Sequence, residues 1–128
     1  ANDIEASMTA YMARRARRDG IMNLFPVLGS AIDPALPEDV DVVFLCDVFH
    51  HIEHVDSFFL PVLRRLKPGG KLVIVDFKPE APEDAPGPPA KMRIAAKTVV
   101  SQLSELGFQE VSIDNETLPY QYIAVLTH

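Results

Sequence analysis

Two apolar runs along the chain have the pattern of strands that are buried on both faces. Residues 40–46 (VDVVFLC) and 71–77 (KLVIVDF) are nearly continuous in apolar side chains and lack the in–out alternation of a half-solvated strand. Strands of a parallel sheet with helices on both faces have this pattern. We therefore expect these two segments to be parallel neighbours at the centre of a sheet.

Three other segments have the composition or the spacing of amphipathic helices. Residues 6–18 combine helix-forming residues with an arginine-rich face, whereas residues 55–66 and 95–106 repeat apolar positions three and four residues apart. Asp56 is a candidate N-cap of the second helix. Pro61 predicts a kink there or a late helix start, because proline lacks a backbone donor.

The remaining strand patterns lie on both sides of these segments. Residues 108–113 and 120–126 read as two strands, and residues 117–119 between them are too few for a crossover helix. The two strands should therefore pair antiparallel. A short strand over residues 21–28 should lie at an edge or end at Pro26, since proline cannot donate to a ladder.

The order of these elements predicts an α/β fold. We expect a Rossmann-like, mostly parallel sheet with helices on both faces and an antiparallel strand pair at its C-terminal end. Residues 79–89, which contain five prolines, form an extended loop. Ligands of such sheets bind beyond the carboxyl ends of the strands. The informative residues are therefore those that follow the strands, namely Gly29–Ser30, Asp47 and Asp76.

Composition narrows the function classes. The 128 residues fit a single domain over 1–128, and a net charge of −6 disfavours binding to nucleic acid. No apolar run approaches the roughly 18–20 residues of a membrane-spanning helix. The first residues do not resemble a signal segment, so we expect a cytoplasmic protein without a membrane partner. The single cysteine, Cys46, excludes an internal disulfide and a multi-cysteine zinc site.

Four segments together resemble one family. Val40–Ile52 (VDVVFLCDVFHHI) is similar to the fourth strand and following loop of class I S-adenosylmethionine-dependent methyltransferases, and Leu66–Asp76 (LKPGGKLVIVD) is similar to their fifth strand. Leu106–Phe108 with the closing antiparallel pair, and Ala1–Ile4 as the acidic end of the second strand, also match. The resemblance covers essentially the whole chain. It implies S-adenosylmethionine as cofactor and a small-molecule acceptor, as in the quinone- and arsenite-modifying members.

One part of the family pattern is missing from this sequence. The first strand and its Gly-rich loop should precede Asp3, so the chain corresponds to the C-terminal two-thirds of the family's domain. In the family this first strand lies between the second and the fourth. We therefore expect the isolated chain to be poorly stable or to associate, because its sheet exposes unpaired backbone edges.

The resemblance assigns cofactor contacts to three chain positions. Asp3, next to Ile4, stands where the family's acidic residue accepts hydrogen bonds from the ribose hydroxyls. Ser30 and Ala31 stand at the adenine position, Ala31 through its backbone N–H. The pair Cys46–Asp47 stands beside the methionine part.

Each of these positions also has a structural interpretation. Asp3 can be a solvated carboxylate, Ser30–Ala31 a plain loop and Asp47 a helix cap. We expect Cys46 to be a buried residue at a strand end, because the acidic neighbour Asp47 disfavours a reactive thiolate.

The catalytic group is not fixed by the sequence. His50 and His51 are weak candidates for a general base, since imidazole titrates near neutrality. His50 and His54 are four residues apart, which is a metal-ligand spacing on a helix. No third ligand is assured, so we predict no metal site.

Three functions remain open at this point. The favoured one is methyl transfer from S-adenosylmethionine to a small molecule. The second is a non-catalytic, truncated methyltransferase-fold module, which the missing Gly-rich loop favours. The third is a nicotinamide-dependent Rossmann enzyme, which the antiparallel end pair and the LKPGG turn disfavour.

Overall fold

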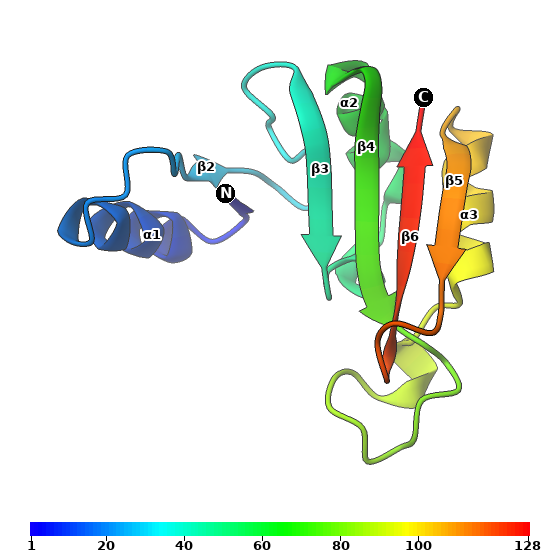
Figure 1. Ribbon diagram of the computed structural model, residues 1–128. Helices are drawn as coiled ribbons and strands as arrows, with labels where there is room; N and C mark the ends of the chain where they lie inside the picture. Colours follow the sequence, from blue (N-terminus) through cyan, green and yellow to red (C-terminus); the bar gives the residue numbers. More distant parts are fainter.

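The computed structural model describes residues 1–128 as two β units joined by one connection (Figure 1). We call residues 1–28 the N-terminal unit: β1 (Asn2–Asp3) pairs in parallel with β2 (Val27–Leu28), and α1 (Ala6–Arg18) joins them. The second unit is a four-stranded sheet in the order β3-β4-β6-β5. Its strands are β3 (Val40–Cys46), β4 (Leu66–Phe77), β5 (Gln109–Asp114) and β6 (Gln121–Thr127).

The two predicted strand pairings are confirmed, and β4 with β6 forms a further antiparallel pair. β3 and β4 are parallel, with Phe44 opposite Val73, and β6 is antiparallel to both β4 and β5. The expected central position of residues 40–46 is wrong, because β3 is the edge of the four-stranded sheet. Figure 1 shows the free edge of β3 facing the N-terminal unit across a gap.

The core lies on one face of the four-stranded sheet. Helices α2 (Val55–Arg65) and α3 (Ala96–Glu105) both cover this face (Figure 1). Their apolar stripes meet the inward residues of β4 and β6, and Phe59 packs against the rings of Phe49, Phe58 and Phe108. This packing follows from the predicted helical spacing.

The opposite face of the sheet is open, which corrects two expectations. No helix covers it, so the expected helices on both faces are not found on this sheet. Phe44 is consequently 62% exposed, and Val42 and Cys46 on the same face are exposed too. The run 40–46 is therefore buried on one face only. Its continuous apolar pattern does not distinguish a strand with one covered face from a strand with two.

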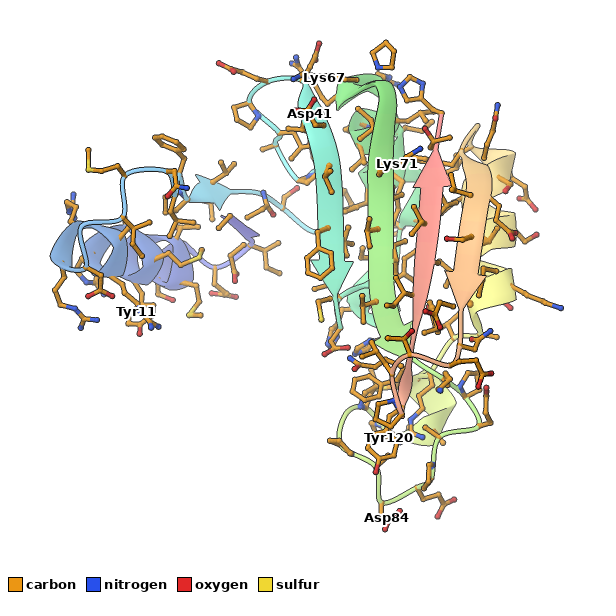
Figure 2. The ribbon with its side chains drawn as sticks, viewed as in Figure 1. Tyr11, Asp41, Lys67, Lys71, Asp84 and Tyr120 are labelled. Carbon is orange, nitrogen blue, oxygen red and sulfur yellow. The ribbon has the colours of Figure 1, made fainter.

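The LKPGG segment forms an irregularity within β4. The register with β3 jumps between Val40–Leu66 and Val42–Lys71, so residues 67–70 bulge out of the ladder. A side chain at Gly70 would lie 2.8 Å from the carbonyl oxygen of Lys67, so only glycine fits there. Figure 2 shows Lys67 beside Asp41 at this end of the sheet, and their ion pair spans 3.0 Å.

One strand and one helix differ from their predicted forms. The strand expected over 21–28 is reduced to Val27–Leu28, directly after Pro26, because it has a single short partner. Helix α2 begins at Val55 with His54 as its N-cap and continues through Pro61, so Asp56 does not cap it. Burial of Phe59 and Val62 outweighs the roughly 3 kcal/mol that an interior proline costs. None of the three α-helices has the length and apolar character needed to span a membrane.

The proline-rich loop after β4 is held in place from within. Arg93 is buried, and its guanidinium donates to the carbonyl oxygens of Pro88, Ala81 and Pro82. Gly87 has a φ of +112° and lies directly on the ring of Phe77, where any side chain would overlap the ring. The loop therefore packs on the carboxyl end of β4 as a fixed wall.

Candidate functional site

Two adjoining cavities lie near the carboxyl ends of the strands. The first cavity, of about 500 Å³, lies between the ends of β1 and β2 and the segment after β3; it is lined by Asn2, Asp3, Ile4, Ser30, Ala31, Val48, His51, Ile52 and Phe58. The second cavity, of about 550 Å³, lies between that segment and the proline-rich loop; it is lined by Asp47, His50, His51, Phe77, Pro86, Gly87, Pro88, Pro89 and Met92. His51 lines both cavities, so they are neighbours.

Seven of the eight sequence-predicted site residues line these cavities. Asp3, Ile4, Ser30 and Ala31 meet in the first cavity, although 26 positions separate Ile4 from Ser30 in the chain. Asp47 and His50 line the second cavity, and His51 lines both. The parallel pairing of β1 with β2 produces this convergence, because it brings the ends of both strands to one edge.

Asp3 offers a partly free carboxylate to the first cavity. Its Oδ1 accepts the backbone N–H of Glu5 at 2.8 Å, and its Oδ2 has no partner within the chain. The contact with Glu5 fixes the side chain at the start of α1. One carboxylate oxygen therefore remains available as an acceptor for a ligand.

Ser30 and Ala31 differ in what they offer. The Ser30 hydroxyl accepts the N–H of Asp33 at 3.1 Å and lies 3.3 Å from the Asp33 carbonyl oxygen, so a local turn already uses it. The N–H of Ala31 donates to no group of the chain. At this position the free donor is therefore the backbone of Ala31 rather than the side chain of Ser30.

His50 forms a buried pair with Asp76. The Nδ1 atom of His50 lies 2.8 Å from Oδ1 of Asp76, and the two side chains are 5% and 2% exposed. Asp76 also accepts the backbone N–H groups of His50 and Phe77. Because a carboxylate only accepts, it places the proton of neutral His50 on Nδ1 and leaves Nε2 as a lone-pair acceptor.

Asp47 holds an unusual backbone conformation. Its φ is +57°, in the left-handed region that non-glycine residues rarely adopt, and the N–H donates to the carbonyl of Val75. Gln121 of β6 donates to its Oδ1 at 2.6 Å. Asp47 does not cap the 3-10 turn that follows, η1 (Phe49–His51), so its interpretation as a helix cap is wrong. It fixes the turn that points the two histidines into the site.

Cys46 lies outside both cavities. Its side chain is exposed on the open face of the sheet, which corrects the expected burial. Partial burial, and after it the charge of Asp47, raise the pKa of the thiol. A thiol in this environment remains protonated, and the described geometry brings it to no cofactor contact.

The three neighbouring histidines, His50, His51 and His54, make different contacts. The ring of His51 lies against that of His50 at an angle of 41°, with the ring centroids 4.2 Å apart, whereas His54 is the N-cap of α2. His50 and His54 therefore do not share a helix face, and Nδ1 of His50 is engaged by Asp76. No three His, Cys, Asp or Glu side chains converge in the structure as metal ligands.

Three residues make contacts around the site that the sequence did not predict. Asp76 is among the informative residues that follow the strands, but nothing in the sequence connects it to His50, 26 positions away. Gln121 and Arg93 carried no signal at all. Of these three residues, only Asp76 could have been found from the sequence, because it stands at the carboxyl end of a predicted strand.

Comparison with known proteins gives the family of the chain. Residues 1–74 match the model of a methyltransferase domain family. The match spans more than half of the chain, so the chain belongs to this family of S-adenosylmethionine-dependent methyltransferases. None of the curated proteins matches the chain significantly.

Solved structures share the fold. A SAM-dependent methyltransferase from Aquifex aeolicus has a TM-score of 0.85 and 23% identity, covering 97% of this chain. The glycopeptide N-methyltransferase MtfA, complexed with S-adenosyl-L-methionine, has a TM-score of 0.77 and 16% identity, covering 98% of this chain and 70% of its own. An O-methyltransferase from neocarzinostatin biosynthesis, in complex with S-adenosyl-L-homocysteine and 1,4-dihydroxy-2-naphthoic acid, has a TM-score of 0.74 and 16% identity, covering 93% of this chain and 38% of its own. The chain spans 65% of the Aquifex protein's length.

Proposed function

We propose that this chain carries the acceptor side and part of the cofactor side of an S-adenosylmethionine-dependent methyltransferase that acts on a hydroxyl group of a small molecule. The observation that carries this proposal is the convergence of Asp3, Ala31 and His51 on one cavity that adjoins a second cavity lined by His50. Membership of the methyltransferase family supports it against the nicotinamide-dependent alternative.

The residues of the first cavity fit the adenosine part of the cofactor. The free Oδ2 of Asp3 is an acceptor for a ribose hydroxyl, and the free N–H of Ala31 is a donor for a ring nitrogen of adenine. Ile4, Ile52 and Phe58 provide the apolar walls that an aromatic base needs. When bound, the cofactor supplies an electrophilic methyl group on a positively charged sulfur.

The second cavity fits the acceptor. Its volume of about 550 Å³ lies within the range of small-molecule sites, which is roughly 300–1,000 Å³. Phe77, Met92 and the prolines of the loop make its wall largely apolar, and His50 and Asp47 supply the polar groups. The neocarzinostatin enzyme named above is in complex with 1,4-dihydroxy-2-naphthoic acid, a hydroxylated aromatic molecule of the size that such a cavity takes.

His50 is the general base of this proposal. A hydroxyl group is a poor nucleophile until its proton leaves, and the unprotonated Nε2 of His50 is the acceptor for that proton. Asp76 holds the ring and the tautomer through the 2.8 Å contact at Nδ1 and stabilises the imidazolium that forms. Positioning of the acceptor against the walls of the second cavity supplies the rest of the rate.

The test compares two neighbouring histidines. Methyl transfer to hydroxynaphthoic and hydroquinone acceptors is measured for the protein and its His50→Gln, Asp76→Asn and His51→Gln variants. We expect His50→Gln to lower kcat/KM by roughly 10²- to 10⁴-fold, the usual contribution of a general base. His51→Gln, which removes the neighbouring ring and keeps the pair, should cost much less.

Two outcomes contradict the proposal at different levels. Equal losses of kcat/KM for His50→Gln and His51→Gln would contradict the assignment of His50 as general base. The proposed methyltransferase activity would still stand. No binding of S-adenosylmethionine to any variant or to the protein itself would leave the non-catalytic module as the better explanation.

A further inference from the structure

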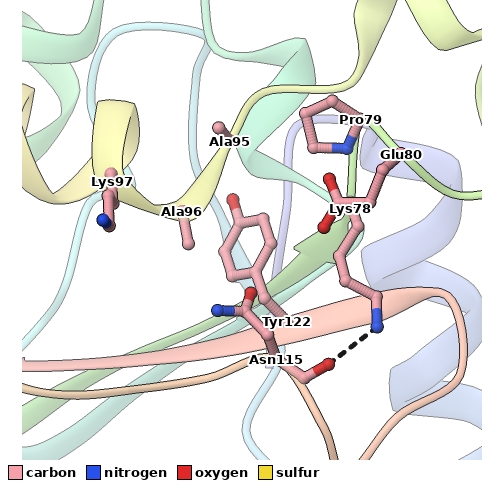
Figure 3. A pocket seen from close by; sticks show the side chains of 8 residues that line it. All are labelled: Lys78, Pro79, Glu80, Ala95, Ala96, Lys97, Asn115 and Tyr122. Carbon is pink, nitrogen blue, oxygen red and sulfur yellow. Dashed lines mark hydrogen bonds between the residues drawn. The ribbon is translucent and has the colours of Figure 1, made fainter.

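A third, smaller cavity lies at the start of α3, separate from the two cavities of the site. Its volume is about 170 Å³, and it is lined by Lys78, Pro79, Glu80, Ala95, Ala96, Lys97, Asn115 and Tyr122 (Figure 3). It shares no residue with the first or second cavity. A water molecule takes roughly 30 Å³ in the liquid, so the cavity has room for a small ligand group.

The start of α3 has no cap. Ala95 stands at the N-cap position, where Ser, Thr, Asp or Asn would normally accept a backbone N–H of the first turn. The N–H groups of Ala95, Ala96 and Lys97 donate to no group of the chain. These three residues line the cavity, so their unpaired donors and the positive end of a ten-residue helix are gathered at it.

Tyr122 brings a fourth unpaired donor to the same place. Its side chain is fully buried, and its hydroxyl is the one buried side-chain polar atom of the chain without a hydrogen-bond partner. Figure 3 shows the ring extending from β6 with the hydroxyl directed at the Ala95–Ala96 start of α3. Leaving a buried hydroxyl unpaired costs free energy, so a ligand that accepts from it is favoured.

The charges around the cavity favour an anion. Lys97 has no ion-pair partner, and Lys78 is fixed by donating to the carbonyl oxygens of Asn115 and Leu118 at 2.8 and 2.9 Å. Glu80 is the one acidic residue of the lining. Asp76, opposite Tyr122 in the sheet, is paired with His50. Burial, and after it the charge of Asp76, raise the pKa of the Tyr122 hydroxyl, which therefore remains a neutral donor.

We propose that this cavity is a binding site for a small oxyanion group, a carboxylate or a phosphate, held by the N–H groups at the start of α3, the Tyr122 hydroxyl and Lys97. Helix N-termini bind such groups through free N–H donors and the helix dipole. The Tyr122 hydroxyl adds a charge-assisted hydrogen bond from a direction that the helix does not supply. The site lies outside the proposed methyl-transfer cavities and does not depend on them.

The test uses inorganic phosphate and acetate as probes. Thermal melting of the protein is followed in each salt and in sodium chloride of equal ionic strength, and affinity is taken from the dependence of the melting temperature on concentration. We expect stabilisation by at least one oxyanion beyond that by chloride. The more effective probe identifies the group as phosphate or carboxylate.

The variants separate this site from general salt effects. Tyr122→Phe should weaken oxyanion affinity by roughly 10-fold or more, since a hydrogen bond to a charged group is lost. In chloride alone it should be at least as stable as the parent, because it removes an unpaired buried hydroxyl. Lys97→Met should weaken binding several-fold, and Lys91→Met, which removes a lysine outside the cavity, should not.

Three results would overturn the proposal. One is equal stabilisation of the parent and Tyr122→Phe by the oxyanions, which would show a general effect of the salt. Another is the absence of any stabilisation beyond chloride. The third is a loss of stability of Tyr122→Phe in chloride alone, which would show that a water molecule already satisfies the hydroxyl.

Discussion

The four-stranded sheet and the N-terminal unit are stabilised very differently. The sheet with α2 and α3 encloses one continuous cluster of buried apolar residues that includes Phe59, Leu72 and Tyr122. In the N-terminal unit, Ala16 is the only buried residue of α1, and the paired strands are two residues long. Met22 there is 86% exposed, and Phe25 is exposed as well. Since burial of apolar surface is the main stabilising contribution, the sheet is the stable part of the chain.

The four-stranded sheet and the N-terminal unit contribute different residues to the proposed site. His50 and Asp76, which we assign to acceptor chemistry, belong to the well-packed sheet. Asp3 and Ala31, which we assign to the cofactor, lie in or just after the N-terminal unit. Changes in the core of the sheet should therefore affect the whole chain, whereas changes in the N-terminal unit should affect mainly the proposed cofactor contacts.

The largest expected effect is in the sheet core. Phe59→Ala should lower the free energy of unfolding by about 3–5 kcal/mol, because Phe59 is fully buried among three other aromatic rings. Met8→Ala, the matched change on the exposed face of α1, should stay within about 0.5 kcal/mol. Urea unfolding of both variants measures the difference. Similar losses in the free energy of unfolding would show that the sheet and the N-terminal unit are equally well packed.

The next effect compares two glycines. Gly70→Ala should cost about 1–3 kcal/mol, because its Cβ would lie 2.8 and 3.0 Å from two backbone oxygens in the sheet. Gly20→Ala at the end of α1 meets no atom within 4 Å and carries only the cost of its φ of +67°, about 1 kcal/mol. Unfolding in urea again gives both values. A larger loss at Gly20 would reverse the comparison.

A smaller effect concerns the open edge and face of β3. Phe44→Lys replaces an exposed apolar residue of an unpaired edge strand, so it should change the free energy of unfolding by less than about 0.5 kcal/mol. It should, however, reduce self-association, because charged residues protect sheet edges. Sedimentation of the parent and the variant over a concentration series measures this. A parent that stays monomeric at every concentration would contradict the expected association.

The smallest effect is a pH dependence at the β5–β6 connection. The side-chain and backbone hydrogen bonds from Thr117, with the N–H of Glu116, hold the pKa of Asp114 below its usual value of 3.8. A carboxyl whose pKa is lowered on folding contributes stability above the unfolded pKa and loses it as the pH falls through the folded one. The advantage of the parent over Asp114→Asn should therefore be present at pH 7, decline as the pH falls below about 3.8, and vanish only below the lowered pKa of the folded state. A difference that persists in acid would contradict this assignment.

The sequence predicted the directions of the main strands, because these depend on local patterns. The candidate cofactor residues came instead from the resemblance to the methyltransferase family, and their roles stay predictions. The parallel pair 40–46 and 71–77 and the antiparallel end pair follow from apolar runs and connection lengths. The open face of β3 could not be predicted, because an apolar run does not reveal whether anything covers it. The His50–Asp76 pair also could not, because it depends on the depth of two side chains 26 positions apart.

The cofactor assignment rests most directly on Asp3, and calorimetric titration with S-adenosylmethionine tests it. We predict that Asp3→Ala weakens binding by roughly 10- to 150-fold, because hydrogen bonds to a charged acceptor contribute about 1.5–3 kcal/mol. His51→Ala, which changes the shared wall of the two cavities, should leave affinity within a few-fold of the parent and lower turnover instead. If Asp3→Ala binds S-adenosylmethionine as tightly as the parent, the first cavity does not hold the ribose, and the central claim fails.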